Sequence, residues 1–173
     1  KAALAEAGFP DGEGLPEIVI SLNSGAGHEG IMEMIRADWA AIGVESRLEG
    51  TEWADYLDKI ASGDYDAGRL GWTADYPIID NFVYPLFSRT SYDNYSFYTN
   101  RVVDGLIEEA RQTVDTDERV AKYQDIVRMI GDDCPVIPLL TLRHGDVGSD
   151  RVHDLTLSAQ GLLSLEKAWI GED

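Results

Sequence analysis

Hydrophobic and polar residues in the first 72 positions follow two periods in turn. They alternate with a period of two in Glu17–Asn23 and in Val44–Glu49, which is typical of strands. After each segment, apolar residues recur at helical spacing. The two helical series end at Gly43 and Gly63, and glycine readily adopts the left-handed conformation that ends helices. With a third extended segment at Tyr65–Trp72, this order predicts an α/β fold with a mostly parallel sheet flanked by helices.

Helical patterns dominate the part of the chain that follows. A loop containing Pro77 leads to a short predicted helix near Asn81–Phe87, and an aromatic stretch comes next. Apolar residues then form one stripe over Val103–Val114 and another over Val120–Ile130. Such stripes predict two amphipathic helices, each with one face packed on a core.

Polar residues and glycines mark the expected ends of these elements. Thr51 is expected to cap the helix that follows it, and Asp115 with Glu118 resembles a capping box between the two long helices. Lys1–Ala7 has the pattern of the end of a helix that stops at Gly8. We therefore expect the chain to begin inside a domain and to be a piece of a longer protein.

The last quarter of the chain has two strand-like runs. Pro135–Leu142 is predicted to be a buried strand, and Val152–Leu157 has strand character, whereas the rest of Gly145–Asp173 is less regular. Cys134 is the only cysteine and has no histidine close to it in sequence. We expect it to be a small buried apolar residue and not a reactive thiol.

Composition and charge exclude some function classes. The chain has 173 residues, of which 44% are hydrophobic and 27% charged, and this suits one globular domain. Its formal net charge of −18 would repel phosphate backbones and anionic lipid surfaces, so nucleic acid is not expected as a partner. No apolar run is long enough to span a membrane.

A series of short strings resembles one known family. GWTADY at Gly71–Tyr76, after GDYD at Gly63–Asp66 and before DNF at Asp80–Phe82, is similar to the family 5 extracellular solute-binding proteins. These are the dipeptide and oligopeptide receptors of ABC importers. The resemblance continues through AEAGFPDG, IGV and EWADYL upstream and NYSFYTN and CPVIPL downstream, and so covers nearly the whole chain. Where the family often has Asp-Pro, this chain has Ile78-Ile79, which leaves side-chain specificity open.

The resemblance implies a type II periplasmic-binding-protein fold, in which two lobes joined by a hinge enclose a ligand. Residues 1–145 would form the second, C-terminal lobe, and residues 146–173 a segment that returns towards a first lobe missing from this sequence. The implied function is non-catalytic binding of a peptide or similar small solute, without a cofactor, for delivery to the permease of an ABC transporter. The implied location is periplasmic or at the extracellular face of the membrane, free or lipid-anchored.

The resemblance also points to a residue for the ligand's charge. In peptide-binding members, the aspartate after the Gly-Trp pair holds the α-ammonium group of the peptide, and Asp75 is the matching residue. A carboxylate that faces a closed cleft needs a cation, and a ligand ammonium would form a charge-assisted hydrogen bond with it. The alternative reading of Asp75 is a cap for the turn before Pro77.

Neighbouring aromatic and amide side chains are further candidates. Trp72 either supplies an apolar wall for the ligand or belongs to the core at the end of a strand. Tyr76 and Asn81 line the same loop and are weaker ligand-binding candidates. Asn94 with Tyr98 is expected to fix the aromatic stretch and not to touch ligand.

Other function classes were weighed on the same residues. A lobe that senses ligand for a membrane receptor shares every feature above and stays an alternative. Asp75 and Asp80 suggest the carboxylate pair of a glycoside hydrolase, but with 32 acidic residues in the chain such a pair arises easily by chance. No metal site is expected, because His28 lacks the second histidine of a zinc motif, and Asp64 with Asp66 lacks the later ligands of a calcium loop.

Overall fold

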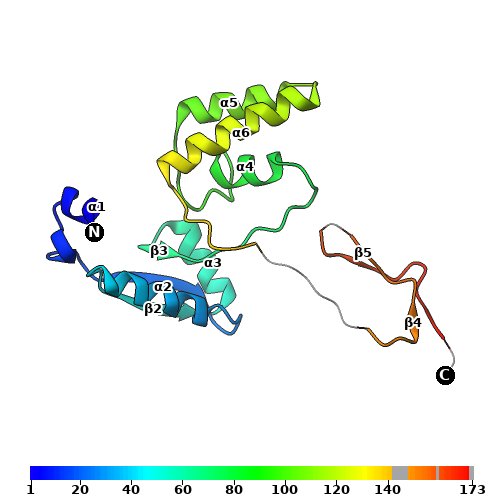
Figure 1. Cartoon of the computed structure of the whole chain (residues 1–173), viewed down its shortest axis with the longest axis horizontal. Coiled ribbons are helices and arrows are strands. Elements are labelled where there is room, and N and C mark those ends of the chain that lie inside the picture. The colour runs from blue at the N-terminus through cyan, green and yellow to red at the C-terminus, as the bar shows by residue number, and fades with distance from the viewer. Residues whose placement is uncertain (142–147, 159, 172–173) are drawn as a thin grey trace. The chain divides into compact units, whose positions relative to one another are not determined.

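The structure is a computed structural model that describes residues 1–141, 148–158 and 160–171 (Figure 1). The chain divides into two compact units, Lys1–Gly71 and Trp72–Asp173. None of the helices among the described residues is long and apolar enough to cross a bilayer.

The first unit is an α/β layer built on a small parallel sheet. Its sheet order is β2-β1-β3, with β1 in the middle and both neighbours parallel to it. The strand–helix–strand–helix–strand order expected from the sequence is confirmed. The elements are α1 (Ala2–Glu6), a 3₁₀ turn η1 (Pro10–Gly12), β1 (Ile18–Asn23), α2 (Glu29–Ala41), β2 (Ser46–Thr51), α3 (Trp53–Ser62) and β3 (Ala67–Gly68).

The sheet buries alternate residues against α2. Ile20 and Leu22 of β1 are 3% and 1% exposed and form a core cluster with Met32 of α2, to which Leu48 of β2 adds its side chain. Alternation along a strand places these residues on one face, and the helical period aligns Met32 with them. The apolar periodicities of strand and helix therefore meet in one core.

α3 fixes the backbone of the sheet through one tyrosine. Tyr56 is fully buried, and its hydroxyl donates a hydrogen bond of 2.6 Å to the carbonyl oxygen of Arg69, just after β3, and lies 3.3 Å from the carbonyl oxygen of Ser21 in β1. Burial raises the pKa of Tyr56 to about 12, so it stays a donor. α3 then ends at Gly63, which is left-handed with φ +75° as the sequence predicted.

Two expectations for this unit are corrected. Thr51 does not cap α3, because the pairing of β1 with β2 continues to Asn23 opposite Thr51 and keeps it in the strand. Glu52 takes the cap position without a side-chain hydrogen bond. The third extended segment pairs with β1 only at Ala67 and Gly68, so the regular strand is much shorter than the predicted Tyr65–Trp72.

The second unit contains three helices packed on one another. α5 and α6 lie side by side and α4 packs against both (Figure 1). Asp115 caps α6 by accepting a 2.9 Å hydrogen bond from the backbone N–H of Glu118, which is one half of the expected capping box, and the Glu118 carboxylate pairs with Lys122. The helices are α4 (Asp80–Phe87), α5 (Arg101–Gln112) and α6 (Thr116–Asp133), and their buried core consists of Val83, Val103, Ile107, Ala110, Tyr123, Ile126 and Ile130.

Three expectations for residues beside these helices are wrong. α5 ends at Gln112, so Val114 leaves the predicted stripe and is 91% exposed. Cys134 is exposed and not buried, because it ends α6 in a left-handed conformation with φ +50°. Pro135–Leu142 is not a buried strand over its described residues, since Ile137 is 67% exposed and none of residues 135–141 pairs in a sheet. Leu142 lies outside the described residues.

The described C-terminal residues form two small antiparallel pairs. β4 (Val152–His153) pairs with β7 (Trp169–Ile170), and β5 (Thr156–Leu157) pairs with β6 (Leu163–Ser164). The strand character predicted for Val152–Leu157 is therefore present, but it is interrupted at Asp154, where φ is +55°.

Candidate functional site

The loop that leads into α4 brings three of the four candidate residues into contact. The indole nitrogen Nε1 of Trp72 donates a 2.6 Å hydrogen bond to the carbonyl oxygen of Asn81. The backbone N–H of Asp75 donates a 2.9 Å hydrogen bond to Oδ1 of Asn81, and Nδ2 of Asn81 lies 3.5 Å from Oδ2 of Asp75. Asn81 is 4% exposed and occupies the second position of α4. The helix start thus holds the loop at both Trp72 and Asp75.

Asp75 presents a charge that the described residues leave uncompensated. Its side chain is exposed, and no Lys, Arg or His of the described chain lies within ion-pair distance of it. Within the same residues, no backbone N–H around Pro77 donates to its carboxylate, so it does not cap that turn. The carboxylate is therefore available to an external cation.

The aromatic candidates differ in how firmly they are held. Trp72 is half-buried, and its indole is fixed by the hydrogen bond to Asn81. Tyr76 follows Asp75 directly and is 46% exposed. Trp72 is therefore fixed within the loop, whereas Tyr76 is largely open to solvent.

Asp80 faces the helices of its unit and not a second catalytic carboxylate. Its Oδ1 accepts a 2.6 Å hydrogen bond from the hydroxyl of Tyr123 in α6, and Nε of Arg111 in α5 lies 3.6 Å away. Burial and the neighbouring carboxylate together raise the pKa of Tyr123 well above its usual value. The Arg111 guanidinium also stacks on Tyr84 at 4.0 Å. Asp80 therefore acts as an anchor for α4, and the hydrolase alternative finds no support in it.

Asn94 fixes the aromatic stretch, as predicted. Its Nδ2 donates to the carbonyl oxygens of Ser88 and Tyr98, and its Oδ1 accepts from the backbone N–H of Tyr98 and the hydroxyl of Ser96. The residue is 9% exposed. Its amide is thus fully engaged in holding the turn between α4 and α5.

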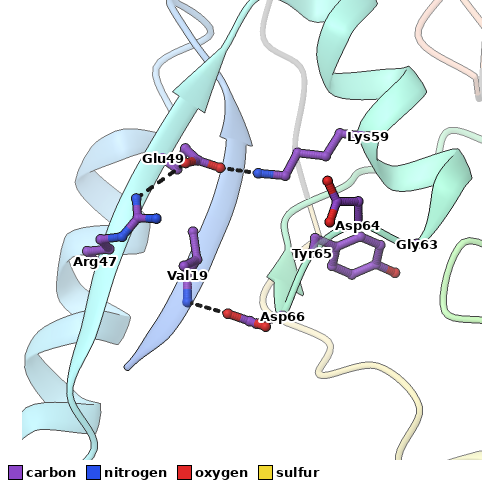
Figure 2. Close-up of a pocket in the computed structure, with 8 residues that line it drawn as sticks. All are labelled: Val19, Arg47, Glu49, Lys59, Gly63, Asp64, Tyr65 and Asp66. Atoms are coloured by element: carbon purple, nitrogen blue, oxygen red, sulfur yellow. Dashed lines mark hydrogen bonds and ion pairs between the residues drawn. The ribbon is translucent and has the colours of Figure 1, made fainter. Parts of the chain in front are cut away.

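A polar pocket of about 370 Å³ lies in the first unit (Figure 2). Glu49 forms ion pairs with Arg47 and Lys59 there, and both cations lower the pKa of Glu49 below its usual value. Asp66 accepts a 2.9 Å hydrogen bond from the backbone N–H of Val19. Sequence analysis did not single out this pocket, whose lining residues are Val19, Arg47, Glu49, Lys59, Gly63, Asp64, Tyr65 and Asp66.

The position of this pocket argues against a ligand site. Val19 and Arg47 are the second residues of their strands, so the pocket lies towards the amino ends of the sheet. Ligands of parallel sheets bind beyond the carboxyl ends. Glu49 and Asp66 are already paired within the chain, and none of the four candidate residues lines the pocket. We therefore interpret the pocket as a structural feature of the first unit and not as a ligand-binding site.

Arg69 is a residue that sequence analysis missed. It follows β3 directly and so lies at the carboxyl end of the parallel sheet, where it is half-buried. No carboxylate of the described residues forms an ion pair with it. Burial and then the Arg69 charge lower the pKa of His28, which precedes α2. The sequence signal that could have identified Arg69 is an arginine in the third predicted extended segment of a strongly acidic chain.

Comparison with known proteins identifies the family. Residues 1–94, more than half of the chain, match the model of the bacterial extracellular solute-binding proteins, family 5 Middle. The chain belongs to this family, as the sequence resemblance predicted. The family is one of extracellular proteins, and the solved structures that the chain matches include periplasmic and oligopeptide-binding proteins, which confirms the predicted periplasmic-binding-protein fold.

Individual relatives show how much of a whole protein this chain represents. It is 28% identical over 142 residues to di/tripeptide-binding protein 1 of Pseudomonas aeruginosa strain UCBPP-PA14, covering 81% of the chain and 26% of the relative. It is 32% identical over 143 residues to heme-binding protein A of Haemophilus influenzae, covering 80% and 26%. The structure of HbpA2 from Haemophilus parasuis matches 99% of the chain and 34% of that protein, with a TM-score of 0.79 and 30% identity. The chain spans about a quarter of the length of the two curated relatives.

Proposed function

We propose that the full-length protein containing this chain binds a peptide, or a similar small solute with a free amino group, and delivers it to an ABC importer without catalysing a reaction. One observation carries the proposal: Asp75 is an exposed carboxylate, held by the neutral amide of Asn81, without a cation partner in the described chain. Trp72 and Tyr76 would supply the apolar walls of the site.

Relatives support a peptide as the ligand class. Matched proteins are named as di/tripeptide-binding, dipeptide-binding and oligopeptide-binding proteins. An ammonium group taken out of water needs a charged or strongly polar partner, and the Asp75 carboxylate offers one. The similarity to heme-binding protein A makes heme the second candidate ligand. Heme carries carboxylates and no ammonium group, so the two candidates make opposite demands on Asp75.

The partners follow from how such a site gains affinity. A single exposed loop excludes little water, so tight binding requires a second surface to close over the ligand. We propose that a first lobe of the same protein supplies that surface, with residues 1–145 as the second lobe and 146–173 returning towards the first. The closed form would then dock on the permease at the periplasmic or extracellular face of the membrane, with the protein free or lipid-anchored.

The test is calorimetry on the full-length protein with trialanine and N-acetyl-trialanine. The Asp75→Asn variant should weaken trialanine about 10- to 100-fold, the range of one charge-assisted hydrogen bond. N-acetyl-trialanine, which lacks the ammonium group, should bind the two proteins alike. Asp58→Asn is the control, because it removes the same charge from an exposed position on α3. Equal losses for both peptides would remove Asp75 from the site, and uptake of hemin without any peptide binding would favour heme.

A further inference from the structure

We propose that Asn81 is a positioning residue: its buried side-chain amide holds the backbone of Asp75 and so places the Asp75 carboxylate where it receives the ligand's amino group. The inference rests on the proposed function of Asp75 and assigns Asn81 a role behind the loop. Because Asn81 is 4% exposed, we assign it an indirect role that acts through Asp75.

The contacts of Asn81 fix the loop at separate points. Its backbone carbonyl oxygen accepts a hydrogen bond from the indole N–H of Trp72 at 2.6 Å. Its side-chain Oδ1 accepts one from the backbone N–H of Asp75 at 2.9 Å. Its Nδ2 lies 3.5 Å from Oδ2 of Asp75, which is long for a hydrogen bond and orients the carboxylate weakly. The backbone of Asp75 is therefore held more firmly than its side chain, and the side chain can still adjust to a ligand.

The neutrality of the amide matters for the chemistry of the site. A lysine or arginine in this place would hold the carboxylate as well, but it would compensate the charge that a ligand ammonium must meet. An amide holds the backbone of Asp75 without adding a positive charge beside its carboxylate. Among the described residues, Nδ2 of Asn81, which is neutral, is the donor that approaches this carboxylate.

The preceding residue keeps Asn81 itself in place. Asp80 accepts the Tyr123 hydroxyl of α6 at 2.6 Å and lies 3.6 Å from Nε of Arg111 in α5. These contacts attach the first turn of α4 to the two long helices. Consecutive residues at the start of α4 thus have different partners: Asp80 contacts α5 and α6, and Asn81 contacts the loop that holds Asp75.

The first arm of the test needs no ligand. In the full-length protein, the Asp75 amide should exchange with solvent deuterium more slowly than the Tyr76 amide, because it donates to Asn81. Asn81→Ala and Asn81→Leu, the second of which keeps the buried volume, should speed exchange at Asp75. The control is Asn94→Ala, which removes another buried amide of the same unit and should leave the Asp75 amide protected. Unchanged exchange at Asp75 in the Asn81 variants would overturn the inference.

The second arm measures the preference for trialanine over N-acetyl-trialanine. Both Asn81 variants should reduce this preference about fivefold, the value of roughly one hydrogen bond, whereas Asn94→Ala should lower stability and leave the preference intact. A wild-type protein without any preference would remove the proposed role of Asp75 and with it that of Asn81. A preference that Asp75→Asn abolishes but both Asn81 variants retain would overturn this inference alone.

Discussion

Removing one hydroxyl from the helical core should loosen the start of α4 by a predictable amount. Tyr123 is 3% exposed, and in Tyr123→Phe the ring still fills the same buried space, so no cavity forms. What is lost is the 2.6 Å hydrogen bond to Asp80, whose side chain is only 14% exposed. Hydrogen bonds to charged groups contribute about 1.5 to 3 kcal/mol. Arg111 stays 3.6 Å from the carboxylate and compensates in part, so we expect a loss near the lower end, about 1.5 to 2 kcal/mol.

Urea unfolding of the full-length protein, followed by circular dichroism, measures this loss from the shift of the midpoint at constant slope. Tyr92→Phe is the matched control, because it removes the same hydroxyl from a side chain that is 98% exposed and should change stability by less than about 0.5 kcal/mol. A Tyr123→Phe protein as stable as this control would show that the Asp80 contact contributes nothing, and the anchoring of α4 would have to be abandoned.

Two further predictions concern a glycine and an acidic residue. In urea unfolding, Gly43→Ala should destabilise the fold more than Gly25→Ala. Both positions have positive φ, which costs an alanine about 1 kcal/mol. At Gly43 the added Cβ would also lie 1.9 Å from the carbonyl oxygen of Asp11, whereas at Gly25 it would meet nothing within 4 Å. Equal losses would contradict this packing. Hydrogen bonds from Tyr98 and then Asn100 lower the pKa of Asp133 below its ordinary value of 3.8. The ionised Asp133 carboxylate therefore stabilises the folded state above pH 3.8, and this stabilisation disappears as the pH falls through the folded-state pKa. Asp133→Asn should accordingly be less stable than wild type near neutrality and equally stable in acid; a pH-independent difference would refute this.

The sequence predicted those elements whose burial partner lies inside the chain. Ile20 and Leu22 alternate because they pack on α2, and Met32 recurs at helical spacing because it packs on them, so each pattern records the same core. The cap at Asp115 was predictable for a similar reason, since it depends only on the backbone N–H three residues ahead. Local patterns are reliable where local geometry decides the outcome.

Patterns failed where distant atoms or an unusual backbone conformation decide the outcome. Ile137 is apolar enough for a buried strand, yet the described residues offer it no sheet partner and it is 67% exposed. Thr51 has good cap chemistry, but the register with β1 keeps it in the sheet. Cys134 has a side chain suited to burial, but its left-handed backbone at the end of α6 places it outside. Composition and spacing contain none of this information.

The family resemblance located the candidate site, and the structure showed which of its residues contact one another. The family pattern pointed to Asp75, and no local rule would have separated it from the other acidic residues of the chain. Asn81 was expected to line the loop with Trp72 and Tyr76. Its burial and its hydrogen bonds depend on how α4 begins beneath the loop, which spacing along the chain does not reveal.

Asn81 ties the loop at two points: its backbone carbonyl oxygen accepts from Trp72, and its side-chain Oδ1 accepts from Asp75. The backbone carbonyl oxygen of Ile78 also accepts a hydrogen bond from the backbone N–H of Asn81, but Ile78 is 50% exposed and its side chain can vary. Exchanges of the Ile78 side chain would therefore change the surface of the loop without moving Trp72 or Asp75. A designer who wished to graft a new side-chain preference onto this scaffold would begin there, and keep the two residues that open α4.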